Sequence, residues 1–135
     1  MDSGITRTKL NTPPFYIIVS TDLAPEDKLL FQIEIKADHP VFKGHFPGFP
    51  VVPGAMMIKI FKELICGYFN KSYMLESSSD IKFLALIEPK ENKSLDIEIG
   101  FRSDGSRLMT SIVVKDKETT CLKMSGIFTE QPSNK

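Results

Sequence analysis

The feature that most constrains the fold is a segment at residues 54–69 that is apolar on three sides. At about 100° per residue of helix, Lys59, Lys62, Glu63 and Cys66 fall within one narrow stripe. The rest of the circumference is apolar: Ala55, Met56, Met57, Ile58, Ile60, Phe61, Leu64, Ile65, Tyr68 and Phe69. Such a helix must be wrapped by other elements, because each fully buried large side chain contributes roughly 1.5–3 kcal/mol. Pro53 and Gly54 fit its start, and Asn70 fits its end.

Strand patterns lie on both sides of this helix in the sequence. Residues 15–19 predict a short strand, and after a turn at residues 24–27 the alternation in residues 29–36 predicts a half-buried strand. After the helix, the nearly all-apolar residues 81–87 predict a central strand, and residues 95–101 alternate. Asp104-Gly105 predicts a hairpin into a strand at residues 108–115, and a further turn leads into residues 120–128.

This order of strands, one long helix and more antiparallel strands predicts an α+β protein. One helix wrapped by a curved antiparallel sheet is the hotdog fold. The length of 135 residues predicts a single domain, with loose ends at residues 1–13 and 129–135.

Charge and cysteine content narrow the class of protein. Seventeen basic and seventeen acidic side chains cancel, so binding to nucleic acid or to a membrane surface is not expected. The opening residues lack a signal-peptide pattern, and no apolar run is long enough to span a bilayer, which predicts a cytoplasmic protein. Cys66 and Cys121 have no paired spacing and are expected to be buried, reduced thiols.

The loop before the helix carries the chemistry. Residues 38–53 hold four prolines, two glycines and both histidines of the chain, His39 and His45. Prolines fix φ and glycines permit close backbone approach, so this loop is predicted to be rigid. An imidazole held beside a helix N-terminus suits acid–base chemistry on a carbonyl compound.

The same loop carries a family resemblance. Gly44-His45-Phe46-Pro47-Gly48, followed by Pro50-Val51-Val52-Pro53-Gly54, resembles the signature of the 3-hydroxyacyl-ACP dehydratases of fatty-acid synthesis, the FabZ and FabA type. His39-Pro40-Val41-Phe42 and Lys82-Phe83-Leu84 also match that pattern. The resemblance implies dehydration of a 3-hydroxyacyl thioester, carried by acyl carrier protein or CoA, to the trans-2-enoyl thioester in fatty-acid or related lipid or polyene biosynthesis. It implies no metal and no organic cofactor.

The resemblance also implies roles for individual residues. His45 takes the proton from C2 of the substrate, which suits an imidazole with an ordinary pKa of about 6.5. Backbone N–H groups around Gly54 and Ala55 polarise the thioester carbonyl. The family's acid, which protonates the departing hydroxyl, lies fourteen residues after the histidine, and this chain has Lys59 there.

Two explanations of the missing acid stay open. Glu63 lies one turn further on the same stripe, about 6 Å along the axis, and is the only carboxylate between Asp38 and Glu76. It either replaces the acid or forms an ordinary surface ion pair with Lys59. Alternatively, since each site in the resembled family takes its histidine and its acid from different subunits, the chain pairs with a related subunit that supplies the acid.

The substrate-binding surface is expected from the loop and the first helical turn. Phe46 and Phe49 are candidates for the mouth of an acyl tunnel, with Pro53 beside them. Of Met56 and Met57, one is expected in the core and one in the tunnel, and Met56 and Lys59 are counted among the expected substrate-binding residues. His39 is expected to brace the loop, while Lys82, Arg102 and Arg107 are candidates for contacts with an acidic carrier.

Two other functions remain alternatives to the dehydratase. One is an acyl thioesterase on the same fold, in which a carboxylate activates water. The other is a catalytically silent subunit that binds an acyl group or its carrier. A homodimer, or a heterodimer with a related hotdog subunit, is expected in each case because one sheet around one helix leaves its edge strands open.

Overall fold

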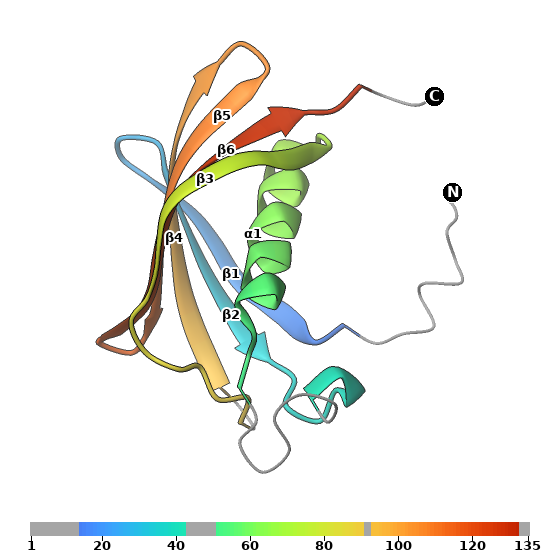
Figure 1. The fold of residues 1–135 in the computed structure, drawn as a ribbon, viewed down its shortest axis with the longest axis vertical. Coiled ribbons are helices and arrows are strands. Elements are labelled where there is room, and N and C mark those ends of the chain that lie inside the picture. The colour runs from blue at the N-terminus through green and yellow to red at the C-terminus, as the bar shows by residue number, and fades with distance from the viewer. Residues whose placement is uncertain (1–13, 43–50, 91–92, 133–135) are drawn as a thin grey trace.

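The computed structural model describes residues 14–42, 51–90 and 93–132 (Figure 1). It contains one long helix, α1 (Gly54–Phe69), and a short 3-10 helix, Pro40–Phe42. The strands are β1 (Tyr16–Ala24), β2 (Lys28–Ile35), β3 (Tyr73–Phe83), β4 (Lys93–Asp104), β5 (Arg107–Asp116) and β6 (Thr119–Glu130). In these ranges no helix is both long and apolar enough to cross a membrane.

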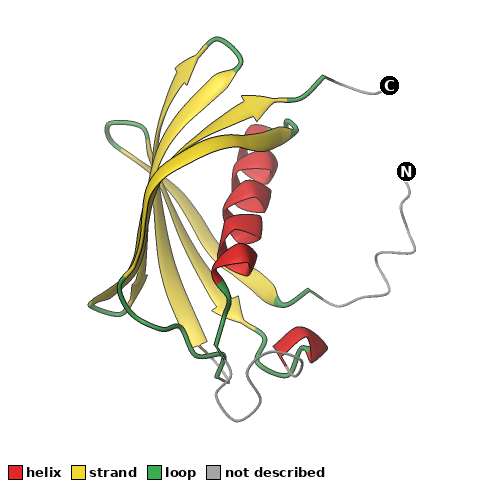
Figure 2. Ribbon diagram, viewed as in Figure 1, coloured by secondary structure: helices red, strands yellow, loops and turns green. Residues whose placement is uncertain are grey.

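The strands form one antiparallel sheet in the order β1-β2-β4-β5-β6-β3, so β1 and β3 are its edges. The sheet bends around α1, which covers one of its faces (Figure 1), and the two layers are separate in Figure 2. This arrangement is the hotdog fold that the sequence predicts.

The core lies between the helix and the sheet. From α1, Met57, Ile60, Phe61, Leu64 and Ile65 are buried. They meet a layer of inward-facing strand residues that includes Leu29, Ile33, Leu95, Ile97, Ile99, Ile112, Val114 and Phe128. These positions alternate along each strand with exposed or half-buried ones, as a sheet with one covered face requires.

The helix ends where the sequence predicts. Pro53 is the N-cap, with φ −65° and ψ 153°, and proline tolerates this position because it has no N–H to satisfy. Asn70 caps the C-terminus in the left-handed region, with φ 55° and ψ 46°, and its N–H donates to the carbonyl of Cys66. Asparagine visits this region more readily than most residues, so it terminates the helix.

The prediction of a central strand at residues 81–87 is wrong. Residues 81–83 form the end of β3, which is an edge strand, and the chain leaves the sheet at Leu84. Phe83, Leu84 and Leu86 are 62%, 54% and 76% exposed, so an apolar run here does not indicate burial within the sheet. The earlier part of β3, residues 73–80, is not predicted as a strand because it is rich in serine and acidic residues, which are depleted in strands.

Three strands are clearly longer than expected, and β4, predicted at residues 95–101, covers Lys93–Asp104. β1 continues from Tyr16 to Ala24, where the sequence predicts a strand only at residues 15–19. β6 continues to Glu130, and the amide of Gln131 donates to the carbonyl of Ser72, so the predicted loose tail begins too early at residue 129. Residues 1–13 and 133–135 lie outside the described residues. Cys121 is buried, as expected, whereas Cys66 is only half-buried.

Candidate functional site

A cavity of about 520 Å³ opens at the N-terminus of α1. Three segments line it: residues 51–54 together with Met57, residues 83–87, and Cys121 with Leu122 of β6. A backbone hydrogen bond joins two of these segments: the N–H of Val52 donates to the carbonyl of Ile87 at 2.7 Å. With side chains that are mostly aliphatic or aromatic, the cavity suits an apolar ligand.

Two backbone amides at the start of α1 have no acceptor within the helix. The carbonyl of Pro53 accepts hydrogen bonds from the amides of Met56 and Met57, at 3.0 and 3.2 Å. The N–H groups of Gly54 and Ala55 precede these bonds, and an α-helix offers such early amides no internal partner. Since Gly54 lines the cavity, this end of the helix presents partial positive charge next to apolar space.

The ring of Phe83 lies so close to the backbone at position 54 that only glycine fits there without a shift. A Cβ added at Gly54 would lie 2.6 Å from Cζ and 2.8 Å from Cε1 of Phe83, closer than carbon atoms approach without a shift. The Phe83 ring therefore lies directly against the helix start. The sequence assigns Phe83 to a strand and to the family-like run Lys82-Phe83-Leu84, but it does not place the ring at the cavity.

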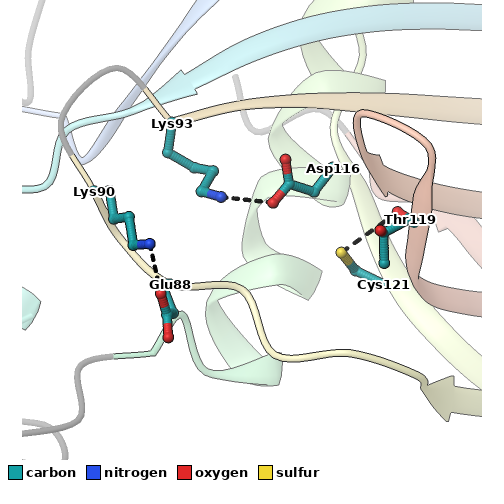
Figure 3. Close-up of polar contacts among 6 residues, drawn as sticks. All are labelled: Glu88, Lys90, Lys93, Asp116, Thr119 and Cys121. Carbon is teal, nitrogen blue, oxygen red and sulfur yellow. Dashed lines mark hydrogen bonds and ion pairs between the residues drawn. The ribbon is translucent and has the colours of Figure 1, made fainter.

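Polar groups lie at the neighbouring ends of the strands (Figure 3). Lys93 and Asp116 form an ion pair at 2.5 Å, and their side chains are only 16% and 25% exposed. The Cys121 thiol donates to the carbonyl of Thr119 at 3.7 Å. Burial raises the pKa of the Cys121 thiol, so this group lines the cavity as a neutral side chain at neutral pH.

Glu63 and Lys59 lie together on the exposed stripe of α1. Lys59 Nζ lies 2.8 Å from Oε2 of Glu63, and the two side chains are 60% and 41% exposed. The hydroxyl of Tyr16, the first residue of β1, donates to Oε1 of the same carboxylate at 2.7 Å. Both oxygens of Glu63 thus have a donor. The sequence carries no signal for the Tyr16 contact, because the two residues are separated by 47 positions.

The structure brings together only part of the predicted site. Pro53, Gly54 and the buried Met57 line the cavity, whereas Met56 does not. Met56 is half-buried against the core, and Ala55 is exposed beside the cavity lining.

The remaining predicted residues are separate from that cavity. Glu63 and Lys59 do not line it: Glu63 lies nine residues beyond Gly54, which is about 13 Å along the helix axis. His45, Phe46 and Phe49 lie outside the described residues, so their predicted roles stay predictions.

The residues around the loop have structural contacts. The ring of His39 packs edge-on against Phe15 and Phe42, with centroid distances of 6.1 and 6.5 Å, as expected for a brace. Arg107 forms two hydrogen bonds with Glu76, at 3.0 and 2.9 Å, which accounts for its position without a carrier protein. Within residues 14–42, 51–90 and 93–132, no cluster of three or more His, Cys, Asp or Glu is placed to hold a metal ion.

Comparison of the sequence with known proteins gives dehydratases as relatives. A family model described as ApeI-like, ApeI dehydratase, matches residues 21–123. The 3-hydroxyacyl-(acyl-carrier-protein) dehydratase FabZ of Aliivibrio fischeri is 25% identical over 118 residues, covering 80% of this chain and 79% of that protein.

Two solved structures share the fold. The dehydratase heterocomplex ApeI:P from Xenorhabdus doucetiae superposes with a TM-score of 0.67 at 17% identity, covering 84% of this chain and 96% of that one. A probable thioesterase from Bartonella henselae superposes with a TM-score of 0.52 at 13% identity, covering 62% of this chain and 76% of that one.

Proposed function

Because the chain belongs to the ApeI-like dehydratase family, we propose that it dehydrates a 3-hydroxyacyl thioester to the trans-2-enoyl thioester. The observation that carries the proposal is the apolar cavity that ends on the free amides of the helix start. An acyl chain fits such a cavity, and a thioester carbonyl is the group that paired N–H donors polarise. Since the FabZ relative is a 3-hydroxyacyl-(acyl-carrier-protein) dehydratase, we propose a substrate attached to acyl carrier protein, with a CoA thioester as the other form.

The proposed reaction uses three groups. His45 removes the proton at C2, and the amides of Gly54 and Ala55 stabilise the negative charge that develops on the carbonyl oxygen. The electrons form the C2–C3 double bond as the C3–O bond breaks. The hydroxyl takes a proton from Glu63 of the second subunit of a dimer and leaves as water, because Glu63 on the same helix lies about 13 Å from Gly54.

The contact between Lys59 and Glu63 is the ion pair expected from helical spacing, and it places a carboxylate beside the family's acid position. Side chains on a helix lean toward its N-terminus, so a carboxylate one turn later reaches back toward the level of residue 59. The Glu63 carboxylate lies 2.8 Å from the ammonium group of Lys59, the residue that stands where the family has its acid. We thus propose that Glu63, one helical turn after residue 59, takes the role of the family's acid.

The reverse reaction provides the test. The wild-type chain is expected to hydrate a crotonyl thioester to the 3-hydroxy product, and His45→Ala and Glu63→Gln are each expected to lower kcat by at least roughly 100-fold. Glu118→Gln, an exposed carboxylate in the β5–β6 turn, is the matched control and is expected to retain full activity. Retention of hydration activity by Glu63→Gln would remove Glu63 from the mechanism.

An acyl thioesterase is a second candidate, and one observation favours it. A carboxylate that accepts hydrogen bonds from both Lys59 and Tyr16 suits a group that takes a proton from water better than one that gives a proton. The two reactions have different products. Hydrolysis releases a free thiol, which a thiol reagent detects, whereas hydration leaves the thioester intact.

A silent subunit is the third candidate, favoured by lysine at the family's acid position. The chain would then pair with a related hotdog subunit, and the similar ApeI:P dehydratase of Xenorhabdus doucetiae is itself a heterocomplex. Such a subunit is expected to be inactive alone and to restore activity when mixed with its partner. Hydration by the purified chain alone excludes this role.

A further inference from the structure

The carboxylate of Glu63 is held by two donors of different character. Lys59 approaches Oε2 from the same helix with a side chain that is 60% exposed. Tyr16 approaches Oε1 from the edge strand β1, and its residue is half-buried by the strands and the helix. The first donor is a flexible, solvated cation, while the second is a neutral phenol attached to a strand.

The backbone that carries Tyr16 is firmly anchored. Tyr16 pairs with Ile35 of β2, and the carbonyl of Phe15 accepts a hydrogen bond from Lys36 N–H at 2.8 Å. Phe15 is buried, and its ring packs edge-on against Tyr16 at 5.2 Å and against Phe42 at 6.3 Å. These contacts leave the phenol little freedom, so it fixes the carboxylate more tightly than Lys59 does.

We propose that Tyr16 is a positioning residue for Glu63, which makes the first residue of β1 part of the catalytic apparatus. This role presupposes the dehydratase reaction proposed above. A phenol O–H donates more strongly to a carboxylate oxygen than to the carbonyl oxygen of a protonated carboxyl group, but it can donate to both and so stays in contact with Glu63 in either state. With Oε1 occupied by Tyr16, the proton that Glu63 transfers is carried by Oε2, and Lys59 swings into solvent to make way for it.

The protonation state of Tyr16 fits a permanent donor. Burial raises the pKa of the Tyr16 phenol, and the hydrogen bond to Glu63 and the negative charge of Glu63 raise it further. The hydroxyl therefore keeps its proton throughout the neutral range. Tyr16 orients the carboxyl group without exchanging protons in the reaction.

The test compares Tyr16→Phe with Tyr68→Phe in the crotonyl thioester hydration assay. Tyr16→Phe removes only the hydroxyl and is expected to lower kcat roughly tenfold while KM changes less than about twofold. Tyr68 is an exposed tyrosine at the other end of α1, and Tyr68→Phe is expected to leave both constants unchanged. In a Glu63→Gln background, Tyr16→Phe is expected to change kcat by less than about twofold, because no carboxyl group remains for Tyr16 to position.

The outcomes separate this role from the function it presupposes. A wild-type chain without hydration activity overturns the dehydratase proposal and the role of Tyr16 with it. An active chain that loses activity on Glu63→Gln but keeps its full kcat in Tyr16→Phe overturns the role of Tyr16 alone. Equal losses from Tyr16→Phe in both backgrounds also overturn it, since they indicate a general structural effect.

Discussion

At the scale of single residues, the two contacts with most chemical consequence join parts of the chain that are distant in sequence. Tyr16 of β1 bonds to Glu63 of α1, and Phe83 of β3 lies against Gly54. The hydrogen bond from Tyr16 acts on the charged carboxylate of Glu63, and the contact between Phe83 and Gly54 shapes the cavity. Each therefore makes a separate prediction.

Tyr16 makes the stability of the protein sensitive to alkaline pH. Its pKa in the folded state is raised above the ordinary value of 10.0, so the folded protein binds this proton more tightly than the unfolded chain does. The resulting stabilisation is complete below about pH 10 and is lost as the pH rises toward the folded-state value. Urea unfolding between about pH 8 and 11 is expected to show a steeper loss of stability in the wild type than in Tyr16→Phe. Parallel curves for the two proteins would contradict this.

Gly54 and Phe83 are expected to be energetically coupled. Alanine in the first turn gains roughly 0.5–1 kcal/mol in helix propensity over glycine, but its Cβ would meet the Phe83 ring at 2.6 Å. In a Phe83→Ala background, Gly54→Ala is expected to stabilise by about that amount. With Phe83 present, the gain is expected to be cancelled or reversed. Equal effects in both backgrounds, measured by urea unfolding, would show that the contact carries no energy.

At the scale of elements, α1 is defined by its ends as much as by its apolar faces. Pro53 begins it and Asn70 ends it, with the amides of both Asn70 and Lys71 directed at the carbonyl of Cys66. These bonds depend on the left-handed conformation of Asn70. A residue that resists this conformation therefore loosens the last turn of the helix.

Substitution of Asn70 tests the cap. Asn70→Gly is expected to be neutral or slightly stabilising, because glycine adopts positive φ freely. Asn70→Val is expected to destabilise the protein by about 1–2 kcal/mol, because a β-branched side chain clashes with its own backbone there. Thermal unfolding of the two variants measures the difference, and similar midpoints would contradict the role assigned to the cap.

The elements differ in how far the sequence predicts them. The bounds of α1 follow from Pro53 and Asn70, which act through local backbone geometry. The sequence predicts β2 and β4 through their alternation of apolar and polar residues, which arises because one face of each strand is buried. β3 does not follow, because it is an exposed edge strand whose residues 76–80 are polar.

The site was predictable only where its residues lie close together on one element of secondary structure. The helix start is visible in the sequence as Pro53-Gly54, whereas the Phe83 ring reaches it through tertiary packing. Likewise the contact between Lys59 and Glu63 follows from helical spacing, whereas the bond from Tyr16 depends on how β1 joins the sheet. Sequence periodicity predicts which residues are neighbours within one helix or strand. It does not predict contacts between two different elements.

At the scale of the whole molecule, exposed apolar side chains gather at both edges of the sheet, on β1 and at the end of β3 beside the cavity. Phe83, Leu84 and Leu86 are all more than half exposed, and they follow one another at the end of the edge strand β3. Contiguous exposed apolar side chains of this kind favour contact with another protein surface. We therefore place the interface of the proposed homodimer or heterodimer at this segment.

A charge at Leu86 is expected to separate the subunits. Leu86→Glu introduces a carboxylate into the proposed interface and is expected to convert a dimer into a monomer in sedimentation or light-scattering measurements. Leu23→Glu is the control, since Leu23 is 59% exposed on β1 at the opposite edge of the sheet. A dimer that survives Leu86→Glu but dissociates with Leu23→Glu would move the interface to β1.

The irregular pairing of β3 with β6 has a consequence for behaviour at high concentration. The register shifts between Leu75 and Ser77 and again between Ser79 and Lys82, and Asp80 has a φ of 53°. The β3 edge of the sheet is thus broken into short runs. Fibril growth needs a long, straight edge that templates the next strand, and the β3 edge offers none. At this edge the chain is protected against amyloid-like stacking, next to exposed apolar side chains that would otherwise favour it.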